Sequence, residues 1–434
     1  MRNATFMERP AGAGSDRNTG ETDRHPIRLA GTLLLAVAMA CQGSAIAAAI
    51  PADHPGIRYY GRFDFANPKA PRFDWPGTSI QARFAGPSVS VRLTGGENDF
   101  NAYVDGAHKT RISLQAGKTE YEIATGLPAG EHTLLLTKRT EASYGTATFQ
   151  GLILADGKDL ADPPPRPSIR ILFVGDSFTV GYGADAATTS CQSLRPWDNN
   201  DAAYGPVSAK ALGAEYSIQA ISGKGMVHNY GESVALSKDP MPSYFDRTLA
   251  GSAQPAWNFP SWIPHIVVVA LGTNDFSTAV KPGRDQYVSA YKAFLQRLRG
   301  HFPSAEIVCV SFAVDSFQGP YAEAMVREAN EAGDAKIHWV GMPALSNAEL
   351  GCDWHPNVAG HQKFAEVLVP ALKPLLPAVG TAPRSGRADR PGLRFPWPAN
   401  GLFRRLAAGE GWTDARGRRV KGIPELDMAR PDAN

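Results

Sequence analysis

The chain has little of what marks the specialised classes of protein. Only four of its 434 residues are cysteines, which is far from the density of a disulfide-stapled scaffold. The formal net charge is +2, so nothing indicates a nucleic-acid partner. Outside the N-terminal region no apolar run reaches the roughly 18 residues of a transmembrane helix. With 43% apolar and 20% charged residues, the composition is that of an ordinary soluble globular protein with room for two domains.

Metal-ligand spacing is also missing. Several histidines lie in the region with the most distinct motifs, but they show none of the spacings that hold zinc. These are His228, His265, His301, His338 and His361. We therefore expect no metal and no other cofactor in the chemistry of this chain.

The N-terminal region has the pattern of a secretory signal. Basic residues up to Arg28 precede an apolar stretch at 29–40, and small-residue cleavage sites follow at 45–47 and 47–49. We predict a lead and signal peptide over 1–49, with the signal itself at about 24–49. The mature protein is then secreted or periplasmic and has no membrane attachment. Cys41 is a poor lipoprotein site, because the branched residue usual three positions earlier is missing.

Short segments with alternating polar and apolar residues fill the region from 55 to 160. They lie at 79–84, 88–93, 101–104, 111–114, 119–123, 132–137 and 146–154. Turn signals such as Asp105-Gly106 separate them. This pattern predicts a β-sandwich of the jelly-roll type. The proline-rich segment at 161–168 is typical of a stiff linker.

After the linker, buried strands alternate with helical stretches. We expect strands that begin at 169, 267, 306 and 336, and helices at 201–212 and 285–298. This order predicts an α/β domain with a doubly wound parallel sheet over 169–377. Residues 378–434 are rich in arginine, glycine and proline and show little periodicity, which predicts a poorly ordered tail.

The most informative motif is Gly-Asp-Ser at 175–177, directly after the first of these strands. A serine at this position lies at the carboxyl edge of the sheet, where α/β folds place their chemistry. The Gly-x-Ser-x-Gly elbow is absent around Ser177, which argues against an α/β-hydrolase. The alternative is that Ser177 merely caps the following helix.

Three downstream motifs, together with Ser177, resemble the four blocks of the SGNH hydrolase superfamily. They are Ser-Gly-Lys-Gly at 222–225, Gly-Thr-Asn-Asp at 272–275 and Asp-Trp-His-Pro-Asn at 353–357, in family order. The serine, glycine, asparagine and histidine of the superfamily's name correspond here to Ser177, Gly223, Asn274 and His355. The resemblance covers about 169–376.

These residue types suit acyl transfer. A serine hydroxyl needs a base to become a nucleophile, and His355 can accept and return its proton. Asp353 can reach the other ring nitrogen and complete a triad. The backbone N–H groups of Ser177 and Gly223, with the Asn274 amide, are the expected oxyanion hole. Gly223 matters because it lacks a side chain, so the substrate can approach its N–H.

Other residues of these motifs have structural explanations that we prefer. Asp176 and Asp275 are expected to shape turns after strands, and Gly225 to be an ordinary loop glycine. Asn357 is expected to cap a helix over 358–372. Asn274 and Gly223 could also be turn residues, but their place in the motif order favours the oxyanion hole.

Trp354 lies between the two triad candidates and has two interpretations. It could pack in the core under the loop, or its indole face could bind a sugar ring at the mouth of the pocket. Weaker candidates for the same cleft are Tyr182, Trp197, Asn229 and Tyr230.

The remaining cysteines divide into two groups. Cys309 lies in a predicted core strand and is expected to be a buried thiol. Cys191 and Cys352 lie in loops and could form a disulfide that braces the active-site loop, although sequence cannot establish the pairing.

A jelly roll before an SGNH domain resembles carbohydrate esterase family 2. The resemblance implies a serine esterase that removes O-acetyl groups from plant polysaccharides such as xylan and glucomannan, or from acetylated sugars. Some members replace the triad acid by a backbone carbonyl, and the presence of Asp353 resembles the full-triad members. Two alternatives stay open: an SGNH-type lipid or thioester hydrolase, and a glycan-binding protein with secondary esterase activity.

Overall fold

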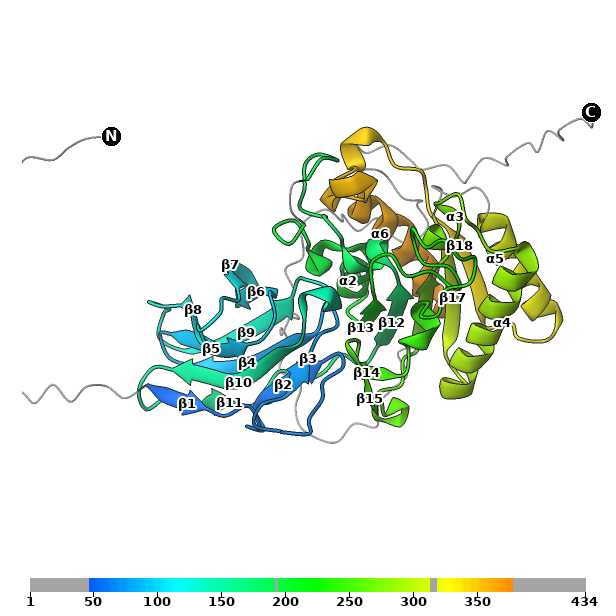
Figure 1. Cartoon of the computed structure of the whole chain (residues 1–434). Helices are drawn as coiled ribbons and strands as arrows, with labels where there is room; N and C mark the ends of the chain where they lie inside the picture. Colours follow the sequence, from blue (N-terminus) through cyan, green and yellow to red (C-terminus); the bar gives the residue numbers. More distant parts are fainter. Residues whose placement is uncertain (1–46, 192–193, 313–317, 378–434) are drawn as a thin grey trace, which may run out of the picture. The chain divides into compact units, whose positions relative to one another are not determined.

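The computed structural model describes residues 47–191, 194–312 and 318–377 (Figure 1). Most of the predicted signal peptide, including Cys41, and the predicted tail at 378–434 lie outside the described residues. Within the described ranges, no helix combines the length and the apolar character needed to cross a bilayer.

The N-terminal domain consists of two antiparallel sheets. The first has the order β1-β10-β5-β8 with β3 on β10, and contains β1 (Ala48–Ile50), β3 (Arg72–Phe73), β5 (Val89–Thr94), β8 (Glu120–Ala124) and β10 (Ala147–Leu154). The second has the order β11-β4-β9-β6-β7 with β2 on β4, and contains β2 (Ile57–Tyr60), β4 (Ser79–Ala85), β6 (Asp99–Val104), β7 (Ala107–Ser113), β9 (Glu131–Lys138) and β11 (Leu160–Ala161).

Alternation along the strands places one apolar face of each sheet in a shared core. In β5, Val89, Val91 and Leu93 are fully buried, whereas the intervening residues are half-buried. They pack in one apolar cluster with side chains of the second sheet, such as Phe84 and Leu134. The predicted strands are present, but the jelly-roll assignment stays a prediction. β1 lies before the predicted domain start at 55, and β11 reaches into the predicted linker.

The second domain is built on a parallel sheet of order β13-β12-β16-β17-β18. Its strands are β12 (Arg170–Gly175), β13 (Glu215–Ala220), β16 (Ile266–Ala270), β17 (Glu306–Ser311) and β18 (Ile337–Gly341). Its α-helices are α1 (Ser177–Val180), α2 (Tyr204–Ala211), α3 (Thr273–Phe276), α4 (Arg284–His301), α5 (Gln318–Glu331) and α6 (Val358–Leu372). A hairpin of β14 (Arg247–Leu249) and β15 (Ser252–Ala256) completes it.

Helices cover both faces of this sheet, as the near-continuous apolar strands require. Leu172 and Val174 of β12 pack on one face in a cluster with residues of α4 and α5. Ile171 and Phe173 pack on the other face with residues of α2 and α6. Figure 1 shows these helix pairs around the sheet. The doubly wound α/β prediction is confirmed.

Two of the predicted helices differ from the structure at their ends. The helix expected at 201–212 is divided into a 3₁₀ turn, Asn200–Ala202, and α2, because the backbone of Ala203 is extended between them. The helix expected at 285–298 extends to His301 as α4. Other 3₁₀ turns in the described ranges are Ala142–Tyr144, Met241–Ser243, Phe259–Ser261, Asn347–Glu349, Cys352–Trp354 and Lys373–Leu375.

The strand order decides where a site can form. From β12 the chain moves outward to β13, then returns past β12 to β16 on its other side. Connections therefore leave the carboxyl ends of β12 and β16 in opposite directions and open a crevice there, which is where open α/β sheets bind ligands. Ser177 and Asn274 follow these two strands.

Buried polar contacts join the two domains. The carboxylate of Asp74, in the β-domain, accepts hydrogen bonds from the backbone N–H groups of Ala250 at 2.9 Å and Gly251 at 3.0 Å. Arg62 donates to the carbonyls of Phe245 and Arg247, both at 2.6 Å. Because these groups are buried and paired across the junction, the domains depend on each other for their hydrogen bonds.

Candidate active site

Ser177 begins the short helix α1 at the carboxyl end of β12. Asp176 occupies the N-cap position, where its Oδ1 accepts a hydrogen bond from the Phe178 N–H at 3.1 Å. The cap role considered for Ser177 therefore belongs to Asp176, as expected for this turn residue. Gly175 must lack a side chain, since a Cβ there would lie 2.0 Å from the Thr179 hydroxyl.

His355 lies against Ser177. Its Nε2 is 2.8 Å from Ser177 Oγ, which is the distance that proton transfer between base and nucleophile requires. The Tyr182 ring packs on the imidazole with centroids 4.3 Å apart, and the Phe178 ring meets it edge-on at 5.3 Å. Burial lowers the pKa of His355 below its usual 6.5, and the nearby carbonyl and carboxylate of Asp353 oppose this shift.

The predicted contact between the Asp353 carboxylate and His355 is not the one in the structure. His355 Nδ1 lies 3.0 Å from the backbone carbonyl oxygen of Asp353. The carboxylate instead accepts a hydrogen bond from the Tyr182 hydroxyl at 2.7 Å. The backbone at Asp353 is left-handed, with φ 49° and ψ 39°, which turns the carbonyl toward the ring and the side chain toward Tyr182.

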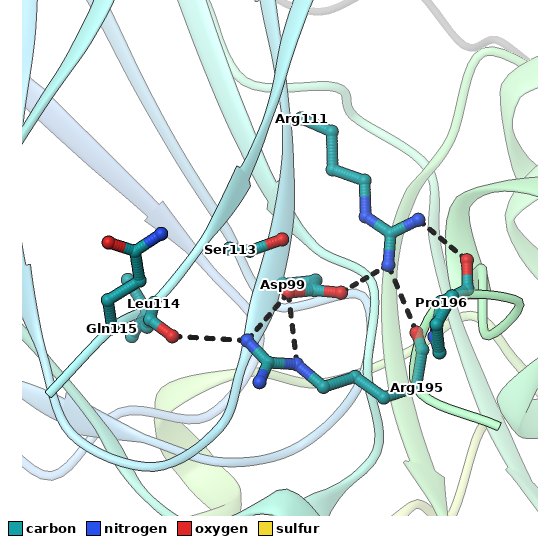
Figure 2. Close-up of a pocket in the computed structure, with 7 residues that line it drawn as sticks. All are labelled: Asp99, Arg111, Ser113, Leu114, Gln115, Arg195 and Pro196. Carbon is teal, nitrogen blue, oxygen red and sulfur yellow. Dashed lines mark hydrogen bonds and ion pairs between the residues drawn. The ribbon is translucent and has the colours of Figure 1, made fainter. Parts of the chain in front are cut away.

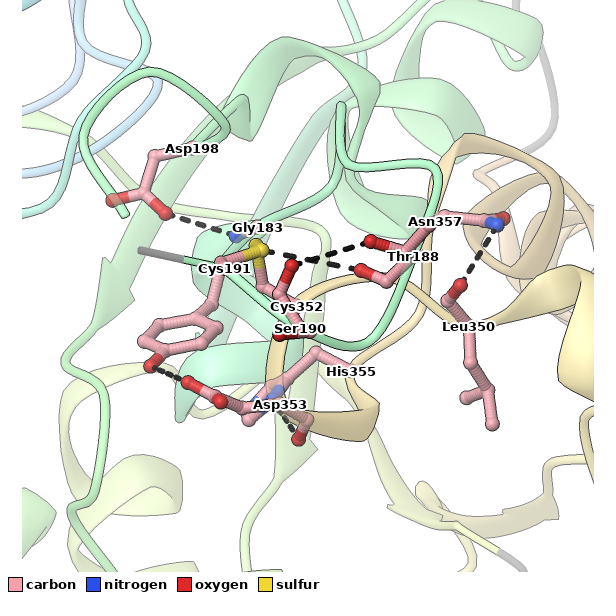
Figure 3. Close-up of a disulfide and its surroundings, with 11 residues drawn as sticks. Gly183, Thr188, Ser190, Cys191, Asp198, Leu350, Cys352, Asp353, His355 and Asn357 are labelled. Carbon is pink, nitrogen blue, oxygen red and sulfur yellow. Dashed lines mark hydrogen bonds between the residues drawn. A yellow bond between two sulfur atoms is a disulfide. The ribbon is translucent and has the colours of Figure 1, made fainter. Parts of the chain in front are cut away.

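The loop that delivers His355 is held in an uncommon conformation. Asp353 and the following Trp354 both have positive φ, at 49° and 62°, a region that non-glycine residues enter only when their surroundings enforce it. A disulfide joins Cys352 to Cys191 with a Cα–Cα distance of 5.4 Å (Figure 3), and the Asp353 N–H donates to the Thr189 carbonyl at 2.8 Å. The segment around 189–191 thus fixes the histidine loop.

Gly223 lies in the loop after β13, and Asn274, in the short helix α3, contacts this loop. Gly223 has φ +76°, and a Cβ there would meet nothing closer than 3.9 Å, so its glycine is required by conformation and not by space. The Asn274 amide donates to the Lys224 carbonyl at 2.9 Å and to Asp176 Oδ2 at 3.3 Å. The structure thus links Asn274 to both the serine turn and the glycine loop.

Asp275 has a larger structural role than the turn former we predicted. Its carboxylate accepts hydrogen bonds from three consecutive backbone N–H groups, those of Met226, Val227 and His228, at 2.7, 2.8 and 2.9 Å. Gly225 is also more than a loop glycine, since a Cβ there would lie 2.0 Å from the His228 carbonyl oxygen. Sequence reasoning missed both constraints, because the partners lie on another loop.

The aromatic candidates divide by exposure. Trp354 is 64% exposed, so the core-packing interpretation is wrong. Tyr230 is 63% exposed and Trp197 40%. Asn229, by contrast, is buried, and its amide donates to Glu232 and Asp239, both at 2.9 Å. Asn229 therefore holds a loop together, and its place in the cleft stays a prediction.

Two further sequence predictions are confirmed. Asn357 caps α6, since its Oδ1 accepts from the N–H groups of Ala359 at 2.9 Å and Gly360 at 3.1 Å. Cys309 is a free, buried thiol in β17, and burial raises its pKa to about 12.

A hollow of about 510 Å³ lies away from the serine, between β-domain strands and the 195–196 loop (Figure 2). Arg111 and Arg195 line it, but both guanidinium groups bind Asp99 and backbone carbonyls. The hollow contains none of the candidate catalytic residues.

In the part of the chain that the structure describes, no group of three or more His, Cys, Asp and Glu residues is placed to hold a metal. The expected absence of a metal stays a prediction.

Two family models match the two domains. The model described as carbohydrate esterase 2 N-terminal matches residues 59–164, and that of the GDSL-like lipase/acylhydrolase family matches residues 173–363.

Proteins of known function show the same likeness over both domains. The cellulase/esterase CelE of Acetivibrio thermocellus is 37% identical over 333 residues, and the alignment covers 74% of this chain and 40% of that protein. The chain thus spans about two fifths of that relative's length. An acetylxylan esterase/glucomannan deacetylase of Cellvibrio japonicus is 30% identical over 334 residues, with coverage of 74% and 90%.

Solved structures agree with these matches. A family two carbohydrate esterase from Clostridium thermocellum, in complex with cellohexaose, is 33% identical with a TM-score of 0.70, covering 74% of this chain and 98% of that one. A carbohydrate esterase family 2 enzyme from Corynascus thermopiles is also 33% identical, with a TM-score of 0.66 and coverage of 74% and 99%.

Proposed function

The chain belongs to carbohydrate esterase family 2, and we propose that it is a secreted serine esterase that removes O-acetyl groups from plant polysaccharides or acetylated sugars. The observation that carries the proposal is the 2.8 Å contact between Ser177 Oγ and His355 Nε2, at the carboxyl end of β12. The relative from Cellvibrio japonicus, named as an acetylxylan esterase and glucomannan deacetylase, supports the substrate class.

In the first half of the reaction, Ser177 Oγ attacks the acetyl carbonyl carbon while His355 Nε2 takes the hydroxyl proton. The resulting tetrahedral intermediate carries an oxyanion. When it collapses, the bond to the sugar oxygen breaks and His355 returns the proton to that oxygen. The products are the free sugar hydroxyl and an acetyl-Ser177 ester.

In the second half, water attacks the acetyl-Ser177 ester and His355 takes a proton from it. Collapse of the second tetrahedral intermediate returns that proton to Ser177 Oγ and releases acetate. We assign the oxyanion hole of both steps to the N–H groups of Ser177 and Gly223 and to the Asn274 amide. The amide hydrogen bond from Asn274 to Asp176 is long, at 3.3 Å, and is replaced by a hydrogen bond to the oxyanion.

Asp353 serves the histidine through its backbone. Its carbonyl, 3.0 Å from Nδ1, accepts that N–H, fixes the tautomer and stabilises the imidazolium. The carboxylate contributes only as a nearby negative charge. This is a serine–histidine pair oriented by a loop carbonyl, in place of the triad expected from the sequence.

Exposed aromatic rings support a sugar substrate. We assign Trp354, which is 64% exposed and directly precedes His355, to contact with a sugar ring beside the scissile acetyl group. Secretion is part of the proposal on the strength of the apolar segment at 29–40 and the small-residue sites after it.

A second candidate is a glycan-binding protein with secondary esterase activity. One related structure was solved with cellohexaose bound, which makes an unacetylated β-glucan a reasonable ligand to test. Titration of the Ser177→Ala protein with cellohexaose measures this binding separately from hydrolysis.

The proposed function is tested by acetate release from acetylated xylan and acetylated glucomannan, together with hydrolysis of short- and long-chain nitrophenyl esters. We expect release from at least one polysaccharide, preference for the short-chain ester, and a loss of several orders of magnitude in kcat for Ser177→Ala. Ser243→Ala, at a serine outside the catalytic motifs, is the matched control and should keep wild-type activity. A Ser177→Ala protein with more than about a tenth of wild-type turnover contradicts the nucleophile, and preference for long chains points to a lipid esterase.

A further inference from the structure

The loop that carries Gly223 takes a hydrogen bond from the other domain. The backbone N–H of Ser222 donates to Oε2 of Glu141 at 2.9 Å. Glu141 belongs to the β-domain, where it follows β9 by three residues and precedes the 3₁₀ turn Ala142–Tyr144. Its side chain is buried, with 6% exposure. The contact joins residues 81 positions apart and lies one residue before Gly223.

A buried carboxylate persists only where donors and opposite charge compensate for lost water. Here the compensation comes from the same segment of the β-domain. Lys138 is fully buried, and its ammonium group donates to the carbonyls of Thr140 at 2.6 Å and Glu141 at 3.0 Å. The lysine therefore fixes the backbone that presents Glu141, and burial lowers the lysine pKa to about 7 and raises that of Glu141.

The downstream side of the glycine loop is fixed within the hydrolase domain. The Gly223 carbonyl accepts from the Tyr230 N–H at 2.8 Å, and the Lys224 carbonyl accepts from the Asn274 amide at 2.9 Å. The N–H of Gly223 belongs to the planar peptide that begins at Ser222. A displacement of Ser222 therefore moves the N–H that the proposed oxyanion hole uses.

We propose that Glu141 is a positioning residue for the oxyanion hole: by holding the Ser222 N–H, it aims the N–H of Gly223 at the oxyanion. The inference rests on the proposed function, because it takes Gly223 as an oxyanion donor. The β-domain then contributes to the active site indirectly, through the Glu141 carboxylate that binds the loop of Gly223, in addition to any part it has in binding glycan.

Two substitutions separate this role from general support of the fold. Glu141→Ala removes the acceptor, so Ser222 is released and kcat for a short-chain nitrophenyl ester should fall about 10²-fold, with KM changed by less than about threefold. Glu141→Gln keeps an amide oxygen that can accept from Ser222, and its kcat should be at least about tenfold above that of Glu141→Ala.

The matched control is Arg62→Met. Arg62 is also a buried β-domain side chain that binds backbone groups of the hydrolase domain, but its partners, the carbonyls of Phe245 and Arg247, belong to none of the catalytic motifs. Its removal should lower the urea midpoint of unfolding and leave kcat per active site within about threefold of wild type. Active sites are counted by the extent of fluorophosphonate labelling at completion, with Ser177→Ala as the unlabelled blank.

The outcomes distinguish the two proposals. A wild-type protein that neither releases acetate nor labels overturns the proposed function itself. An active wild type with a Glu141→Ala variant of equal kcat overturns the positioning role. The positioning role is also overturned if Arg62→Met and Glu141→Ala lose kcat equally, or if Glu141→Gln shows no recovery.

Discussion

Replacement of Asp353 by asparagine tests how His355 is oriented. If the carboxylate held Nδ1, as in a full triad, the substitution would be expected to lower kcat about 10⁴-fold through the wrong tautomer. In the structure the backbone carbonyl makes that contact and the carboxylate binds Tyr182. Asparagine retains the carbonyl, and its amide oxygen can still accept from the Tyr182 hydroxyl, so the histidine should keep its orientation.

What Asp353→Asn removes is one negative charge near the imidazolium. A neighbouring opposite charge shifts a pKa by about 1–3 units, and one unit corresponds to about 1.4 kcal/mol, or tenfold in rate. The charge of Asp353 raises the pKa of His355 less than its carbonyl does, which places the effect at the low end of that range. We therefore expect kcat to fall about tenfold.

The assay is kcat and kcat/KM against pH with a short-chain ester. For the wild type, activity should rise as His355 loses its proton, with a midpoint below 6.5, because burial lowers this pKa. Loss of the Asp353 charge destabilises the imidazolium further, so the rising limb of Asp353→Asn should move to lower pH. Glu349→Gln is the control, since that carboxylate pairs with Lys363 at 2.9 Å and not with His355. A loss of about 10³-fold or more in Asp353→Asn would refute the carbonyl mechanism.

Three other substitutions test separate parts of the structure. Asn274→Ala should lower kcat about 10²–10³-fold with little change in KM, whereas a pure KM effect would make Asn274 a substrate-binding residue only. Cys191→Ser removes the disulfide to Cys352, a bond that joins residues 161 positions apart. The free energy of unfolding in urea titrations should fall by about 2–5 kcal/mol. An unchanged urea midpoint would show that the disulfide does not stabilise the fold. His361 is fully buried, and burial lowers its pKa to about 3. The free energy of unfolding should therefore fall as the pH drops below about 6.5, and His361 should contribute up to about 1.4 kcal/mol per pH unit to this fall. His361→Gln should reduce that slope.

Local signals in the sequence were enough to predict most of the elements and part of the site. Alternation of polar and apolar residues located the β-domain strands, because one face of each sheet is buried. The apolar strands of the second domain predicted the parallel sheet with both faces covered. Ser177 and His355, which are 178 residues apart, were expected to meet because each belongs to a recognisable motif, and the structure brings them within 2.8 Å.

The residue roles that sequence could not give depend on backbone conformation or on partners far along the chain. Nothing in Asp-Trp-His indicates that Asp353 adopts a left-handed backbone and thus presents its carbonyl to the histidine. The Glu141 contact depends on how the two domains pack. Ser222 belongs to the motif at 222–225, but nothing in the local sequence around Glu141 indicates that it is the partner of this motif. The loop contacts of Asn229 could not be predicted for a related reason, since a polar residue in a loop can equally face the cleft or bind the loop itself.

The acidic groups around the site share a further property that bears on catalysis. Glu141, Asp198 and Asp275 each accept backbone N–H groups, from Ser222, from Gly183, and from the 226–228 loop. Burial raises the pKa of all three carboxyls, that of Asp198 to about 7. A full negative charge near a developing oxyanion would oppose the transition state. Carboxyls whose charge is shared with N–H donors can hold these loops with less of that repulsion, so acidic side chains are compatible with the oxyanion hole that we propose.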